Sequence, residues 1–171
     1  MKNICLVGVK NIFFEKTMLR FMKDYIYVSE NETRVSCLTK GRLFVYDTAA
    51  DFTDIGAVYE GMIFKNDFFS PFDIRKRFDG RGIVLLSEGC PRAASTLDGL
   101  GMRYNVCGLD RGCGIMPSSI SEDTVTVSLR NIVRLDGSLV CDGEEYRLRG
   151  NFNVYNICPA MMGSVTDRLF L

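Results

Sequence analysis

The pattern of apolar and polar positions changes character about two-thirds of the way along the chain. In the first part, apolar runs alternate with segments of helical spacing. Residues 4–9 are apolar apart from one glycine, as is typical of a strand buried on both faces of a parallel sheet. Between residues 11 and 25 the apolar positions recur every three or four residues, which predicts an amphipathic helix. We therefore expect the chain to open with a buried strand and a helix that covers the sheet.

Residues 82–109 show the same alternation in a tighter form. An apolar run at 83–86 ends at a glycine-containing turn, a short helix-like segment follows, and a second apolar run covers 104–109. This order predicts a strand–helix–strand crossover with parallel strands. Ligands of such sheets bind beyond the carboxyl ends of the strands, which here carry residues 87–90 and 108–111.

The chain between these two crossovers contains several short segments with β propensity. We expect strands at 27–28, 34–38, 43–46 and 62–64, with a turn at 39–42. Residues 48–60 are interpreted as a loop or a short helix. The phenylalanine-rich segment at 68–78 is interpreted as core or a packing lid, because such clusters are more often buried than they are ligand cages.

The last third of the chain has the alternation of half-buried strands. Polar and apolar residues alternate strictly over 124–129, which is typical of an antiparallel strand with one buried face. Further strands are expected at 131–135, 138–141 and 145–148, separated by Asp-Gly turns, so that the pattern predicts an antiparallel β-meander. The glycines and the proline of 112–120 predict an irregular start, and the spacing over 154–169 predicts a closing helix.

Together these patterns predict a single α/β domain over residues 1–171. We expect a Rossmann-like part at 1–110, with a mostly parallel sheet and helices. An antiparallel β-meander at 111–150 and a C-terminal helix at 151–171 follow it. The length of 171 residues suits one domain, and 47% hydrophobic with 25% charged residues is ordinary globular composition.

Charge and cysteine content limit which binding partners and which cellular compartment we expect. The 21 basic and 21 acidic residues balance, so nothing attracts the chain to nucleic acid or to a membrane surface. The seven cysteines are an odd number, and the opening apolar run is too short for an export signal. No apolar run is long enough to span a bilayer. We therefore expect a cytoplasmic protein in a reducing compartment.

The residue types limit the chemistry. The chain has no histidine, which removes the commonest general base and metal ligand. Residues 7–11 lie where a phosphate-binding loop belongs, but they lack its Gly-x-x-x-x-Gly-Lys-Ser/Thr pattern. Lys10 could meet an anion at the following helix, although a solvated lysine beside a tight turn is the simpler interpretation. The spacing of Cys107 and Cys113 is not that of a zinc site, so we expect neither metal nor cofactor.

Cys90 is a candidate reactive thiol. It follows Glu88 and precedes Pro91, at the expected start of a helix, where the helix dipole and Arg92 would favour a thiolate. A cysteine in a turn is more often simply packed. We therefore keep Cys90 as a ligand-contact candidate and expect no catalysis from it.

Charged residues at the expected strand ends form a second candidate site. They are Asp47, Glu88, Arg92, Asp110 and Arg111, and with Lys10 and Cys90 they complete the predicted ligand-binding set. Acids and arginines in such a crevice suit a nucleotide, a sugar or an amino-acid-like ligand. The leading hypothesis is a non-catalytic binding or regulatory module. The alternatives are a small transferase or ligase-like enzyme, and a homodimer formed through residues 68–78 or a meander edge strand.

Residues 82–148 resemble the second half of the central domain of Mur-type peptidoglycan ligases. In that family a strand ending in acidic residues precedes a strand that runs into a glycine, and antiparallel strands follow. Leu86-Ser87-Glu88, Val106-Cys107-Gly108 and the segment from Thr124 to Gly137 occupy those places.

The sequence also differs from the family pattern in several places. The phosphate-binding loop of the family would fall at residues 7–17, where its Gly-Lys-Thr is absent. No histidine is present to serve as a magnesium ligand, and we expect the C-terminal ligase domain of the family to be absent. The resemblance therefore implies a fold, and a small relative that does not hydrolyse ATP.

Overall fold

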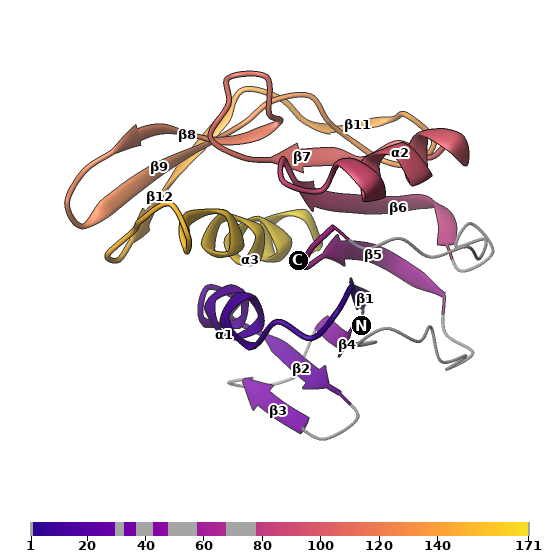
Figure 1. The fold of residues 1–171 in the computed structure, drawn as a ribbon, viewed down its shortest axis with the longest axis horizontal. Helices are drawn as coiled ribbons and strands as arrows, with labels where there is room; N and C mark the ends of the chain where they lie inside the picture. Colours follow the sequence, from indigo (N-terminus) through magenta and orange to yellow (C-terminus); the bar gives the residue numbers. More distant parts are fainter. Residues whose placement is uncertain (1, 30–32, 37–42, 48–57, 68–77, 171) are drawn as a thin grey trace.

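The computed structural model describes residues 2–29, 33–36, 43–47, 58–67 and 78–170 (Figure 1). In chain order the elements are β1 (Lys2–Val7), α1 (Ile12–Arg20), β2 (Tyr25–Val28), β3 (Thr33–Ser36), β4 (Leu43–Asp47), β5 (Tyr59–Phe64), β6 (Phe78–Ser87), α2 (Pro91–Gly99), β7 (Asn105–Cys107), β8 (Ile115–Ile120), β9 (Thr124–Leu129), β10 (Ile132–Val133), β11 (Leu139–Cys141), β12 (Glu144–Arg149) and α3 (Ile157–Phe170). The expectations at 39–42, 48–57 and 68–77 lie outside the described residues.

Ten strands of the described residues form one sheet in the order β12-β9-β8-β7-β6-β5-β1-β4-β2-β3. The strands from β8 to β2 run parallel, whereas β9 pairs antiparallel with both β8 and β12 at one edge, and β3 pairs antiparallel with β2 at the other. A mostly parallel sheet, later antiparallel strands and a C-terminal helix confirm the predicted fold class.

The direction in which successive strands are added to the sheet reverses beside β1. The first strands after β1 extend the sheet on its β4 side, and the chain then returns to lay down β5, β6 and β7 on the other side. The carboxyl ends of β1 and β5 therefore flank a topological switch point, the place where open α/β sheets bind ligands. The Lys65 amide donates to the Val7 carbonyl at 2.8 Å and ties the two strand ends together.

The two faces of the sheet are covered by different helices. Along β1, Ile4 and Leu6 pack on the face covered by α1 and α3, while Cys5 and Val7 pack on the face covered by α2. All four are at most 1% exposed. Because successive strand residues point to opposite faces, this double burial explains why the run at 4–9 contains no charged residue.

The antiparallel part differs in detail from a simple meander. A strand, β8, occupies Ile115–Ile120, where the glycines and Pro117 predict irregular chain. The shift in pairing between Pro117 and Ser119 is a bulge that accommodates the proline within the β8–β9 ladder. β10 and β11 form a separate two-stranded sheet, so that β12 pairs with β9 and not with β11.

β12 is the exposed edge of this antiparallel part. Its exposed positions include Glu144, Glu145, Arg147 and Arg149. Charged side chains along an edge strand oppose pairing with a second chain. A homodimer through a meander edge strand or through residues 68–78 stays a prediction, and residues 68–77 lie outside the described residues.

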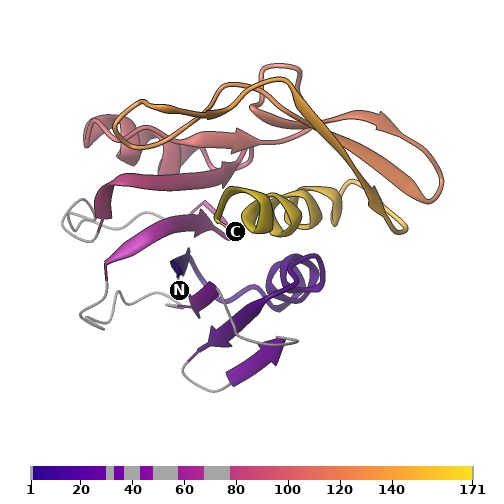
Figure 2. The same ribbon diagram turned by 180° about the vertical axis from the view of Figure 1, so that it is seen from behind.

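Helices α1 and α3 lie side by side on the same face of the sheet (Figures 1 and 2). Their backbones meet at Gly163 of α3, where a Cβ atom would overlap the carbonyl oxygen of Met18. Met18, Met161, Met162 and Val165 fill the rest of this contact and are fully buried. The absence of a side chain at 163 thus sets how closely the two helices pack.

Asp167 gives this contact a pH dependence. Its Oδ2 accepts a hydrogen bond from the Lys23 amide at 2.8 Å. Burial, and to a lesser degree the charge of Asp24, raise the pKa of Asp167 to about 6, although the Lys23 amide opposes the shift. The folded state therefore holds a proton on Asp167 that the unfolded chain, with an ordinary pKa of 3.8, releases earlier as the pH rises.

We predict that Asp167→Asn removes this dependence. The stabilisation from the bound proton is complete below about pH 4 and is lost as the pH rises through about 6. Asn keeps an acceptor for Lys23 and carries no charge, so the variant should be more stable than the wild type at pH 7.5 by about 1 kcal/mol, allowing for partial exposure. The difference should vanish near pH 4. Thermal unfolding at both pH values measures it, and an equal gain from the exposed Glu122→Gln would contradict it.

No helix among the described residues is long and apolar enough to cross a membrane.

Candidate functional site

A pocket of about 320 Å³ opens at the topological switch point, and we call it the crevice. It lies beyond the carboxyl ends of β5 and β6, between the N-termini of α1 and α3. Its lining residues are Asn11, Phe13, Phe14, Lys65, Ser87, Glu88, Gly89, Val154, Tyr155, Cys158 and Pro159. Its volume lies at the lower end of the range for small-molecule sites.

A buried ionic network lies behind the crevice. Lys65, directly after β5, has a fully buried side chain whose Nζ lies 2.9 Å from Glu15 Oε1 and 2.6 Å from Asp47 Oδ1. The Tyr27 hydroxyl donates to the second Asp47 oxygen at 2.6 Å. Burial, followed by the hydrogen bond to Asp47, raises the pKa of Tyr27 well above its ordinary value. One cation and two carboxylates thus connect the ends of β4 and β5 with α1.

The N-terminus of α1 is already occupied by the protein's own groups. Asn11 Oδ1 accepts from the Phe14 amide at 3.0 Å, and Glu15 Oε1 accepts from the Asn11 amide at 3.0 Å. Before the helix, the Asn66 side chain accepts from the Val9 amide and donates to the Val9 carbonyl. These bonds occupy amides that a phosphate would need, and a carboxylate sits at the positive end of the helix dipole.

Glu88 enters the crevice from the end of β6. Its carboxylate accepts hydrogen bonds from the Leu109 amide at 3.1 Å and the Asp110 amide at 3.3 Å. Gly108 makes this possible, because a Cβ atom there would overlap the Glu88 carboxylate. The strand-end residues that sequence reasoning singled out at Glu88 and Gly108 are therefore in direct contact.

Apolar side chains form the rim of the crevice. Asn153 Oδ1 accepts from the amides of Tyr155 and Asn156, and Asn156 Oδ1 accepts from the Asn153 amide at 2.7 Å. This reciprocal capping before α3 fixes a turn whose Val154 and Tyr155 are 69% and 78% exposed. Phe13, in the first turn of α1, is 53% exposed on the opposing helix. Aromatic and apolar groups so exposed are typical of a binding surface.

Three thiols lie close to the crevice, and only one of them is acidified. The neighbouring thiol of Cys107, which donates to the Cys158 carbonyl oxygen at 3.8 Å, lowers the pKa of Cys158, which lies in the first turn of α3. The neighbouring thiol of Cys158 and complete burial raise the pKa of Cys107. Burial, and then the charge of Glu88, raise the pKa of Cys113 to about 11, with its Sγ 3.6 Å from Glu88 Oε2. Cys158 is the thiol of these three that lines the crevice.

The structure places the predicted site residues in different parts of the molecule. Glu88 lines the crevice. Asp110 does not line it and is connected to it only by the hydrogen bond that its backbone amide donates to Glu88. Asp47 is buried behind the crevice in the ionic network. Lys10 and Arg111 are exposed and are not among the lining residues.

Arg92 and Cys90 belong to the N-terminus of α2 and not to the crevice. Arg92 extends toward Asp67, with 4.0 Å between its Nε and the Asp67 carboxylate, which also accepts from the Arg92 and Ala93 amides. Cys90 is 2% exposed and lies 3.2 Å from Ser87 Oγ. Burial raises the pKa of Cys90, which corrects the expectation that the helix start would favour its thiolate.

Sequence reasoning missed several residues that shape the site. Lys65 directly follows the apolar run at 62–64, so the strand-end rule that selected Asp47 and Glu88 could have found it. Tyr155 and Cys158 were assigned only to a closing helix, and nothing in the sequence indicates that this helix begins beside β5 and β6. Among the residues that the structure describes, no group of three or more Cys, Asp or Glu side chains is arranged to hold a metal ion.

Comparison with known proteins gives a structural likeness only. No family model matches the sequence, and no curated protein matches it. MurF from Acinetobacter baumannii has a similar fold, with a TM-score of 0.54 and 9% identity over 99% of this chain and 42% of that chain. So does the UDP-N-acetylmuramate:L-alanyl-gamma-D-glutamyl-meso-diaminopimelate ligase from Neisseria meningitides, with a TM-score of 0.53 and 11% identity over 99% of this chain and 60% of that chain.

This likeness confirms the resemblance predicted from residues 82–148 and extends it. The chain spans about half the length of the two ligases. Over almost its whole length, the chain is similar in fold to part of a Mur ligase.

Proposed function

We propose that the protein is a cytosolic, non-catalytic module that binds a small ligand in the crevice. The observation that carries this proposal is the coincidence of the crevice with the topological switch point, where α/β sheets place their ligands. None of the six described cysteines forms a disulfide, which agrees with a reducing compartment.

Charge narrows the class of ligand. Among the described residues that line the crevice, Lys65 is the one cation, and three carboxylates, those of Glu15, Asp47 and Glu88, lie in or directly behind it. This excess of negative charge opposes a polyphosphate. The negative charge favours a sugar or a nucleoside among the expected ligands. Their hydroxyl and amino groups can donate to Glu88, while a flat apolar face lies on Tyr155 or Phe13.

The local chemistry supports binding rather than turnover. Glu88 is the carboxylate best placed to act as a base, and the thiol beside it, Cys113, stays protonated at neutral pH because its pKa is about 11. The name of one similar ligase contains a UDP-linked sugar, which agrees with a sugar-like ligand.

A thermal-shift panel tests this proposal. Adenosine, uridine, N-acetylglucosamine, N-acetylmuramic acid and UDP-N-acetylglucosamine are compared with ATP. A binder at ten times its Kd should raise the Tm by about 3 °C, and ATP should give the smallest shift. Tyr155→Ala should abolish the shift, whereas Ile120→Ala, which removes a similarly exposed apolar side chain at the end of β8, should leave it. A panel without any shift would count against the proposal.

A small transferase or ligase-like enzyme is the second candidate, and Cys158 favours it. The lowered pKa of this thiol and its place in the crevice suit a nucleophile. Turnover of a panel compound that is lost in Cys158→Ser would establish the enzyme. Binding without turnover, retained in Cys158→Ser, would leave the binding module.

A further inference from the structure

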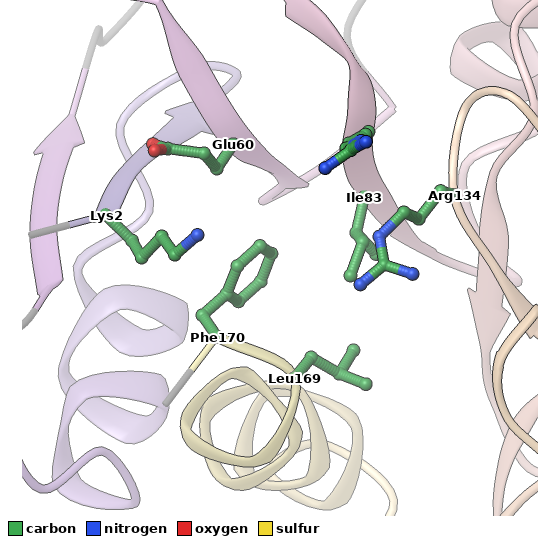
Figure 3. A pocket seen from close by; sticks show the side chains of 7 residues that line it. Lys2, Glu60, Ile83, Arg134, Leu169 and Phe170 are labelled. Carbon is green, nitrogen blue, oxygen red and sulfur yellow. The ribbon is translucent and has the colours of Figure 1, made fainter. Parts of the chain in front are cut away.

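A second pocket, of about 270 Å³, lies at the other end of the sheet, and we call it the basic pocket. It is lined by Lys2, Glu60, Arg81, Ile83, Arg134, Leu169 and Phe170 (Figure 3). Lys2 begins β1 and Glu60 is the second residue of β5, so the basic pocket lies toward the amino ends of the parallel strands. The crevice lies beyond their carboxyl ends, and the two pockets share no lining residue.

The backbone fixes the walls of the basic pocket. The Leu135 amide donates to Gly82 O at 2.9 Å and the Asp136 amide donates to Gly80 O at 3.0 Å. These two bonds hold the segment that carries Arg134 against β6, next to Arg81. The position of the arginine is thus set by the fold and not by a free loop.

An apolar floor completes the basic pocket. The ring of Phe170 reaches it because Gly61 has no side chain, since a Cβ atom there would lie 2.6 Å from Phe170 Cζ. Figure 3 shows the Phe170 ring between Lys2 and Ile83, with Leu169 beside the Arg134 guanidinium. A ligand in this pocket would therefore contact cations on its walls and hydrocarbon below.

The charges are unbalanced in a chain whose total charge is zero. Three cations and one carboxylate line the basic pocket. That carboxylate, Glu60, accepts a hydrogen bond from the Asn3 amide at 2.6 Å. The side chains of Lys2 and Arg134 make no hydrogen bond or ion pair to another described residue. Asp136 is within electrostatic reach of Arg134 and Arg81, but it is fully exposed and accepts from the Ser138 amide at 2.8 Å.

We propose that the basic pocket binds an organic anion, a phosphate or carboxylate joined to an apolar group. The anionic group contacts Arg134, the positive charge of Lys2 attracts it from the opposite wall, and the apolar group packs on Ile83 and Phe170. Guanidinium groups bind both oxyanions through paired hydrogen bonds, which favours Arg134 as the main contact. The proposal is independent of any ligand in the crevice.

Isothermal titration calorimetry at low ionic strength tests it, with phenyl phosphate, benzoate and inorganic phosphate as probes. We expect phenyl phosphate or benzoate to bind, and inorganic phosphate to bind more weakly because it cannot use the apolar floor. Arg134→Gln should weaken binding by about tenfold and Lys2→Gln by a smaller factor. Arg149→Gln, at an exposed position of β12, should change the Kd by less than about twofold.

Three outcomes would overturn the proposal. The first is no binding of either aromatic probe at up to about 10 mM, which corresponds to a very weak affinity. The second is equal affinities for phenyl phosphate and inorganic phosphate, and the third is equal losses in Arg149→Gln and Arg134→Gln. Circular dichroism of each variant confirms that it is folded. Lys2→Gln, which alters an exposed side chain, keeps the test decisive if Arg134→Gln does not fold.

Discussion

Replacing Lys65 by methionine should lower the free energy of unfolding by about 3–5 kcal/mol, because it leaves two buried carboxylates without their cation. Lys65 Nζ lies within 3 Å of both Glu15 and Asp47, and the Lys65 side chain is fully buried. Methionine fills a similar volume, so the loss reports charge and not packing. For a domain of this size the Tm should fall by roughly 10 °C.

Urea denaturation followed by circular dichroism measures this effect. Lys16→Met, on the exposed side of α1, is the matched control and should change stability by less than about 0.5 kcal/mol. Adding Glu15→Gln and Asp47→Asn to Lys65→Met should recover part of the loss, since it removes the uncompensated charges. A Lys65→Met variant as stable as the control would show that the ionic network does not contribute to the free energy of unfolding.

Replacing Gly163 by alanine should cost about 2–3 kcal/mol, although alanine is the better helix former. The added Cβ would overlap the Met18 carbonyl oxygen and lie 2.9 Å from the Met18 carbonyl carbon. Backbone atoms of α1 cannot rotate away as a side chain can. Helices α1 and α3 must therefore separate, and the buried methionines between them lose contacts.

Gly99→Ala is the control for this prediction. Gly99 lies in the last turn of α2, and no atom lies within 4 Å of a Cβ built there. The same substitution should therefore be neutral or stabilising by up to about 1 kcal/mol. Equal effects at 163 and 99, measured by thermal unfolding, would mean that the close approach of α1 and α3 does not hold.

The fold was predictable where the hydrophobic pattern has one interpretation. The uninterrupted apolar run of β1 and the alternation of β9 are such cases, because burial on two faces and on one face leave different patterns. β8 was missed because a proline and flanking glycines usually end a strand, and only the bulge beside Pro117 makes it compatible with the ladder. The pairing of β12 with β9 was missed because it depends on β10 and β11 leaving the main sheet.

The site was predictable only as a location. Being at the end of a parallel strand identifies Glu88 and Asp47, but it does not say which side chain faces the crevice and which turns inward to a partner. That choice depends on Lys65, whose side chain draws Asp47 into the interior, and on Gly108, which leaves room for Glu88. The rim was not predictable, because Phe13 and Tyr155 are far apart in sequence and line one pocket only through the packing of α1 on α3.

The start of α1 is also unsuited to binding a phosphate. In this chain Glu15 and Asn66 occupy the backbone groups around the start of α1. A carboxylate at this position would repel a phosphate. The crevice lies at strand ends where open α/β sheets bind ligands, and the carboxylates around it oppose a phosphate.

The most direct test of ligand binding in the crevice is nuclear magnetic resonance chemical-shift mapping with the sugars and nucleosides of the panel. We predict that at least one of them shifts the backbone amides of Gly89, Tyr155 and Cys158 in a saturable way, while ATP shifts them less. Shifts confined to residues of the basic pocket such as Ile83 and Phe170, or no saturable shift with any compound, would contradict the assignment of the crevice as the ligand site.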